Sequence, residues 1–122
     1  MFRSYRDLQV WQLAMELVKQ VYVATATFPK EELYGLTNQL RRCSISIPSN
    51  IAEGHARESS KEFLHHLSFA MGSLAEFETQ VTLAGELHYI SAATVNDLLA
   101  ASDQLGRKLR GLQKSIRAKV NR

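Results

Sequence analysis

The residues best suited to metal binding are Glu62 and His65, which form one Glu-x-x-His pair. Di-iron bundles use two such pairs together with two further glutamates that face inward, and this sequence holds no second pair. His65 and His66 are adjacent, so they diverge on a helix. His88 closes an apolar stripe, where a packed residue at a helix end is the more common structure. We therefore expect no metal site and no cofactor.

Acid–base chemistry is the other reaction type that the residues raise, because Ser73, Glu76 and Glu78 lie together in GSLAEFE. Glu76 and Glu78 are two positions apart, so on a helix their carboxylates point in different directions. No nucleophile elbow and no paired histidine accompanies them. The sequence therefore predicts a protein that is not an enzyme.

Charge is the stronger functional signal, although the formal net charge is only +3. Residues 1–52 hold six Lys/Arg and four Asp/Glu, residues 53–106 hold two and eight, and residues 107–122 hold seven and none. The three net charges are therefore +2, −6 and +7. A basic terminus is typical of a protein that binds nucleic acid or another polyanion. Cations also stabilise the carboxyl end of a helix through its dipole, so both interpretations stay open.

These residues must be positioned by helices, because apolar side chains recur along the chain every three or four residues. The first such segment spans about residues 7–27, with Asp7 as its N-cap and Pro29 after its end. The third spans 60–88, and SSKE predicts a capping box between Ser59 and Glu62. The fourth spans about 95–116. The stripe positions of the three segments, apolar except for His88 and Ser102, are Val10, Ala14, Leu17, Val21, Ala24 and Phe28; Phe63, Leu67, Ala70, Leu74, Phe77, Val81, Ala84 and His88; and Val95, Leu98, Ser102, Leu105, Leu109, Leu112 and Ile116.

The second segment, RRCSISIPSN at residues 41–50, fits either a strand or a helix. Its alternation of apolar and serine residues is typical of a strand, but a strand needs a pairing partner and no other segment offers one. The helical stripe runs from Leu36 to Ile51 through Pro48. A proline inside a helix costs roughly 3 kcal/mol, and burial of each large apolar side chain recovers roughly 1.5–3 kcal/mol. We therefore expect one helix over residues 36–53, kinked at Pro48, with Gly54 near its carboxyl end and the freed Ser44 carbonyl bonded by a serine hydroxyl or water.

Four helices joined by short links predict a single all-α domain over residues 1–122, an antiparallel up-down-up-down four-helix bundle. In this topology the start of the first helix and the end of the fourth helix lie at the same end of the bundle. The basic residues there form a candidate nucleic-acid-binding surface. We expect Glu53, Glu58 and Glu62 to reach the same end and to neutralise part of it. The basic candidates are Arg3, Arg6, Arg107, Arg110, Lys114 and Arg117.

The sequence also predicts where the protein is found and that it assembles with itself. One cysteine and the absence of a long apolar run or signal peptide favour the cytoplasm and exclude a membrane partner. Phe69 lies on a face that is otherwise polar, and Leu64 and Met71 add a second apolar stripe to the same helix. These three residues are the candidate interface of a homo-oligomer.

LTNQLRRCSISIPSNIAEGHAR resembles the signature of a bacterial family of four-helix-bundle proteins, the 23S rRNA-intervening sequence proteins. YRDLQVWQLAMELV is similar to the family's opening helix, and GSLAEFETQV to its third-helix motif. The resemblance covers almost the whole chain. The residues that match its motifs are Arg42, Pro48, Asn50, Glu53, Gly54, Ser73 and Glu76, and we expect structural roles for them, with an inward Arg41 or Arg42 pairing with Glu76 or Glu78.

This resemblance implies a four-helix fold and a ring-shaped homopentamer. It also implies kinship with the accessory protein of diversity-generating retroelements, a basic pentamer that binds nucleic acid and a reverse transcriptase. Two functions follow as alternatives: an oligomer that binds RNA or DNA through its basic surface, or a scaffold for a polymerase-like protein whose basic helix end is only solvated.

Overall fold

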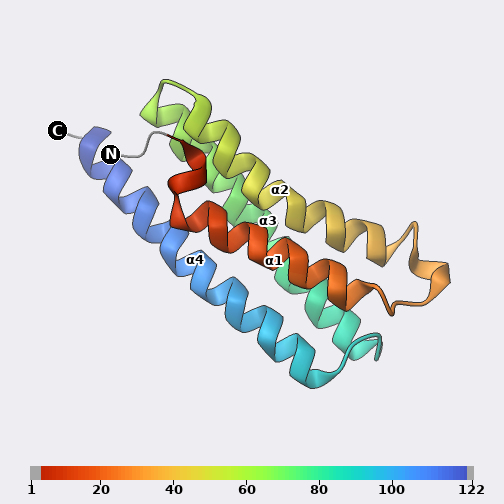
Figure 1. The fold of residues 1–122 in the computed structure, drawn as a ribbon. Helices are drawn as coiled ribbons and strands as arrows, with labels where there is room; N and C mark the ends of the chain where they lie inside the picture. Colours follow the sequence, from red (N-terminus) through yellow and green to blue (C-terminus); the bar gives the residue numbers. More distant parts are fainter. Residues whose placement is uncertain (1–3, 121–122) are drawn as a thin grey trace.

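The computed structural model describes residues 4–120, and this part of the chain forms four long α-helices and two short 3₁₀ turns, without a strand. The helices are α1 (Gln9–Thr25), α2 (Leu36–Ala56), α3 (Ser60–Glu86) and α4 (Ala92–Val120). The turns are η1 (Tyr5–Asp7) and η2 (Lys30–Glu32). Successive helices run in opposite directions, and each helix packs against two neighbours (Figure 1). The all-α four-helix fold expected from the sequence is confirmed.

The start of α1 differs from the prediction, because Asp7 is not its N-cap. Ser4 caps the η1 turn by accepting a hydrogen bond from the Arg6 amide at 3.1 Å, and Asp7 ends that turn. The N-cap of α1 is Leu8, which is buried in the core and has no side-chain acceptor. Burial of an apolar residue at this position therefore fixes the helix start in place of a polar cap.

Helix α2 is continuous through Pro48, as the apolar stripe predicts, and it extends three residues beyond the expected end. Leu40, Cys43, Ile47 and Ile51 are all buried. The two neighbouring serine hydroxyls do not bond the Ser44 carbonyl: the Ser44 hydroxyl donates to the Arg41 carbonyl at 2.9 Å, and the Ser46 hydroxyl to the Cys43 carbonyl at 2.6 Å. The kink at Pro48 stays a prediction.

Helix α3 begins as expected, because the Ser59 hydroxyl accepts a hydrogen bond from the Glu62 amide at 3.3 Å. Its end differs from the prediction. The helix stops at Glu86, and His88 is exposed rather than packed, with a φ of 62°. The His88 amide donates to the Gly85 carbonyl at 3.0 Å and the Tyr89 amide to the Ala84 carbonyl at 2.9 Å. This pair of bonds is a Schellman motif, whose left-handed position glycine usually occupies.

Replacing His88 by glycine is expected to stabilise the protein. A left-handed conformation costs an L-residue roughly 1–2 kcal/mol, and the greater freedom of glycine in the unfolded chain offsets roughly 0.5–1 kcal/mol of this gain. The His88→Gly variant should therefore gain about 0.5–1 kcal/mol in chemical denaturation at fixed protein concentration. His88→Ala serves as the control and should show no gain. An unchanged or lower stability of the glycine variant would contradict this interpretation of the helix end.

The core lies along the bundle axis and is formed by the predicted apolar positions of all four helices. Two of the expected α4 positions, Val95 and Leu112, are only half-buried. The polar residues Ser102 and Gln113 are buried on the same helix. At one end lie the start of α1, the α2–α3 junction and the end of α4, and at the other end lie the α1–α2 and α3–α4 connections (Figure 1).

Candidate functional site

The carboxyl-terminal half of α4 carries the basic face, defined here as Arg107, Arg110, Lys114 and Arg117. All four side chains are exposed, while Leu105, Leu109 and Ile116 on the opposite side of the helix are buried. Arg107 forms an ion pair with Asp103 at 2.9 Å. Within residues 4–120, no carboxylate lies within 4.0 Å of the charged groups of Arg110, Lys114 or Arg117. Three cations of this face are therefore free to meet an external anion.

The remaining basic candidates lie at the amino-terminal end. Arg6 is exposed, and its guanidinium lies 5.6 Å from the centre of the Tyr5 ring. The η1 turn that carries it packs against α1 and α2, at the same end of the bundle as the last turns of α4 (Figure 1). Arg3 lies outside the described residues. The bundle thus brings Arg6 to the same end as the basic face.

The acidic residues at the α2–α3 junction do not neutralise the basic face as the sequence analysis expected. Arg57 lies 3.5 Å from a Glu53 carboxylate oxygen and 4.0 Å from one of Glu62. Glu58 is exposed, and within the described chain it forms no ion pair. The junction neutralises its own cation instead, because a local arginine is the nearest partner for two of these carboxylates.

A polar seam joins α2 to α3, and it consists of Cys43, Ser46 and Asn50 on α2 with His66, Ser73 and Glu76 on α3. The Ser46 and Ser73 hydroxyls lie 2.7 Å apart. The Asn50 amide nitrogen donates to the Ser46 carbonyl at 2.8 Å, and its oxygen lies 3.3 Å from His66 Nδ1. Each of these contacts fixes one helix against itself or its neighbour, so the seam holds the register of the two helices.

The Cys43 thiol belongs to this seam and is poorly reactive. It donates to the Ser73 carbonyl at 3.0 Å. Burial raises the pKa of the thiol to about 12, and the negative charge of Glu76 acts in the same direction. Because the thiolate is the nucleophilic form of cysteine, Cys43 is poorly suited to catalysis near neutral pH.

Gly54 has a packing role and does not end the helix. An ideal Cβ atom at Gly54 would lie 2.6 Å from His66 Cβ and 3.1 Å from Phe63 Cδ1. The absence of a side chain therefore allows α2 and α3 to approach closely, two residues before α2 ends at Ala56. The local sequence predicts a helix end at this glycine, because the neighbouring helix that requires it cannot be read from local sequence.

The inward arginine is Arg41, and its partner differs from the prediction. Its Nε donates to the Thr25 hydroxyl of α1 at 2.8 Å, and its guanidinium lies 4.5 Å from the centre of the Tyr22 ring. Arg42 is exposed, beside Ser46, Ser73 and Glu76 at the surface of the polar seam. Neither arginine forms an ion pair with Glu76 or Glu78 among the described residues.

The acid–base candidates diverge. Glu76 lies at the polar seam, whereas Glu78 faces α4 and accepts a hydrogen bond from the buried Ser102 hydroxyl at 2.6 Å. His65 packs its ring against Phe69, with centroids 4.5 Å apart. Within residues 4–120, no three His, Cys, Asp or Glu side chains are placed to hold a metal ion.

The three interface candidates on α3 have different environments. Phe69 is 51% exposed, and the rings of His65 and His66 lie beside it. Leu64 and Met71 are half-buried and pack against the core of their own chain. Phe69 is therefore the residue of the three that presents a large free apolar surface.

The four helices and the basic face of α4 place the protein in the class of all-α four-helix bundles with a basic helix surface. Residues 6–111 match the model of the family described as 23S rRNA-intervening sequence protein, and the chain belongs to that family. Its fold is similar to a solved structure of a protein of unknown function, from the S23 ribosomal protein family of Bacteroides thetaiotaomicron. The TM-score is 0.78 at 22% sequence identity, over 86% of this chain and 95% of the other. A comparison with curated proteins finds no match. None of the described helices is long and apolar enough to cross a membrane.

Proposed function

We propose that the protein is a non-enzymatic oligomer that binds RNA or DNA through the basic face of α4. The observation that supports this most directly is the set of exposed cations at Arg110, Lys114 and Arg117, none of which has a carboxylate partner in the described chain. Contacts to phosphates are made by such free guanidinium and ammonium groups and are independent of base identity. Binding is therefore expected to show little sequence preference.

Affinity for nucleic acid is expected to fall steeply as salt is added, because each phosphate contact releases condensed counterions. Fluorescence anisotropy with a labelled single-stranded RNA and a labelled DNA duplex measures this directly. We expect binding of both probes at 50 mM salt and a loss of at least tenfold in affinity at 200 mM. Retention on heparin should decrease in the same way.

Absence of binding to either probe in low salt would contradict the proposal. The scaffold for a polymerase-like protein would then be the better explanation, with the basic residues acting only on the helix dipole. Capture of a polymerase-like partner by a protein that itself shows no salt-sensitive affinity for nucleic acid would support that alternative.

We further propose that the chain forms a homo-oligomer through a surface that includes Phe69. Its half-exposed ring is a large apolar group on a polar face, and aromatic residues of this kind are enriched at protein interfaces. The stoichiometry of five rests on the family resemblance. Five chains with a formal charge of +3 each would carry +15, which would increase the long-range attraction for a polyanion.

Sedimentation velocity at micromolar concentration is expected to give a mass close to five chains of 13.8 kDa. Phe69→Ser should shift the equilibrium toward smaller species while leaving the helical circular dichroism unchanged, since Phe69 is not part of the core. Tyr34→Ser, at another exposed aromatic residue, provides the matched control and should leave the mass unchanged. A monomeric wild-type protein would contradict the proposal, and a dimer would contradict the stoichiometry alone.

A further inference from the structure

Three of the four histidines of the chain lie beside aromatic rings at the α2–α3 end of the bundle. The His65 ring lies 4.5 Å from the Phe69 ring, centroid to centroid, and the His66 ring lies 6.0 Å from the same ring. His55 of α2 packs edge-on against Phe63, with centroids 5.7 Å apart. The exposed aromatic residue of the proposed oligomer surface is therefore flanked by two imidazoles.

The hydrogen bonds of Asn50 determine which nitrogen of His66 carries a proton in the neutral ring. The Asn50 side-chain nitrogen donates to the Ser46 carbonyl at 2.8 Å, so the side-chain oxygen is the atom that lies 3.3 Å from His66 Nδ1. Because an amide oxygen can only accept a hydrogen bond, Nδ1 is the donor of this contact. Nε2 is therefore the atom that takes up the second proton, and its uptake leaves the Asn50 contact in place.

No carboxylate within residues 4–120 lies within 4.0 Å of an imidazole nitrogen. Glu62, one turn before His66, has its carboxylate 4.0 Å from Arg57, which also lies 3.5 Å from Glu53. A proton gained by His65 or His66 would therefore produce a cation that is stabilised mainly by water.

Other charged groups surround the two histidines, because α3 packs against both α2 and α4. They are Glu53, His55 and Arg57 on α2, Glu58 in the junction, Lys61, Glu62 and Glu76 on α3, and the basic face on α4. The cations of the basic face and Arg57 oppose a further positive charge, and the carboxylates favour it. None of these groups lies on the exposed Phe69 ring itself, where a second chain would exclude water.

We propose that protonation of His65 and His66 dissociates the homo-oligomer, so that the protein assembles at pH 8 and separates into smaller species at pH 5.5. This inference rests on the oligomer proposed above, in which a second copy of the chain covers Phe69. Histidine is the side chain whose charge ordinarily changes in this pH range. Covering Phe69 also removes water from the two imidazoles beside it, and removing water from an unpaired charge is unfavourable. The free chain therefore binds protons more readily than the oligomer, and acid favours dissociation.

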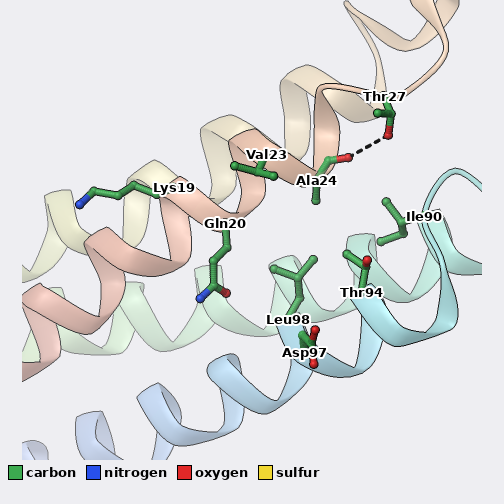
Figure 2. Close-up of a pocket in the computed structure, with 9 residues that line it drawn as sticks. All are labelled: Lys19, Gln20, Val23, Ala24, Thr27, Ile90, Thr94, Asp97 and Leu98. Carbon is green, nitrogen blue, oxygen red and sulfur yellow. Dashed lines mark hydrogen bonds between the residues drawn. The ribbon is translucent and has the colours of Figure 1, made fainter.

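A second apolar surface provides a comparison, because no histidine lines it. It is a hollow of about 670 Å³ between α1 and α4, and Figure 2 shows Ala24 and Leu98 on opposite sides of it. Assembly through this hollow would not respond to the charge of His65 or His66. The effect of these two residues on assembly therefore also reports which surface the chains use.

Sedimentation velocity at pH 8 and pH 5.5 measures the response, and circular dichroism at both values checks that the helices are retained. The wild-type oligomer is expected to require at least tenfold more protein for half-assembly at pH 5.5 than at pH 8. The double variant His65→Gln/His66→Gln keeps polar side chains that do not titrate, so its response should be less than twofold. His88→Gln, in the connection at the opposite end of the bundle, is the matched control and should respond like the wild type.

A fixed positive charge gives a second test that does not depend on assembly of the double variant. His65 is exposed, so His65→Lys should fold normally and should need at least tenfold more protein than the wild type for half-assembly at pH 8. His88→Lys, also at an exposed position, is the control for added charge and should change this concentration less than twofold.

Several results would overturn this inference and leave the oligomer intact: equal assembly of the wild type at both pH values, a double variant that responds like the wild type, or a His65→Lys protein that assembles normally at pH 8. Loss of the helical signal at pH 5.5 would also overturn it, because acid would then unfold the chain. A wild-type protein that is monomeric at both pH values would contradict the proposed oligomer itself.

Discussion

Replacing Gly54 by alanine is expected to lower the free energy of unfolding by about 1–3 kcal/mol, the usual cost of forcing extra atoms into a packed core. The new Cβ would lie 2.6 Å from His66 Cβ, an atom whose position is set by the α3 backbone and not by a side-chain rotamer. The two helices must therefore move apart. This movement also strains the contact between Asn50 and His66, now 3.3 Å.

The matched control for this prediction is Gly72→Ala on α3, because a Cβ atom there meets nothing within 4 Å. Alanine in an exposed helix interior is favoured over glycine by roughly 0.5–1 kcal/mol, so this variant should be more stable than the wild type. Chemical denaturation at one protein concentration measures both variants. A Gly54→Ala protein as stable as the wild type would contradict the close approach of α2 and α3.

Replacing the four residues of the basic face by glutamine is expected to weaken nucleic-acid binding at least tenfold, about 1.4 kcal/mol. The fold should be retained, because the four side chains are exposed and the buried residues of α4 are unchanged. The net charge changes from +3 to −1 per chain. Both the direct phosphate contacts and the long-range attraction are therefore reduced.

A control variant separates the effect of the net charge from the effect of where the basic residues lie on the surface. A control variant carries glutamine at Lys19, Lys30, Arg57 and Lys61 and has the same net charge. If the basic face makes the contacts, this control should lose much less affinity than the variant of the basic face. Equal losses in the two variants would indicate that net charge, and not the α4 surface, determines binding.

The helices could be predicted from the sequence because their apolar spacing is a local property. The stripe from Leu36 to Ile51 correctly predicts a helix through Pro48, although the alternation of serines also fits a strand. The end of α3 was misplaced by two residues, because His88 takes a left-handed conformation that glycine usually provides. The sequence around His88 carries no local signal for that conformation.

Partners across the bundle could not be predicted, because they depend on how two helices are rotated against each other. Arg41 contacts Thr25 and Tyr22 on α1 rather than a glutamate on α3. Gly54 is required by His66, a residue on the neighbouring helix. The polarity of Gln113 likewise conceals its burial.

The most direct test of the proposed function is the salt dependence of DNA affinity for the wild-type protein and the variant with glutamine at Arg107, Arg110, Lys114 and Arg117. On duplex DNA, each phosphate contact contributes about 0.9 to the slope of log affinity against log salt concentration. Loss of up to four contacts per chain should make the slope shallower by about 3–4 for each chain bound. Equal slopes for the two proteins would contradict the account, because the phosphates would then be contacted elsewhere.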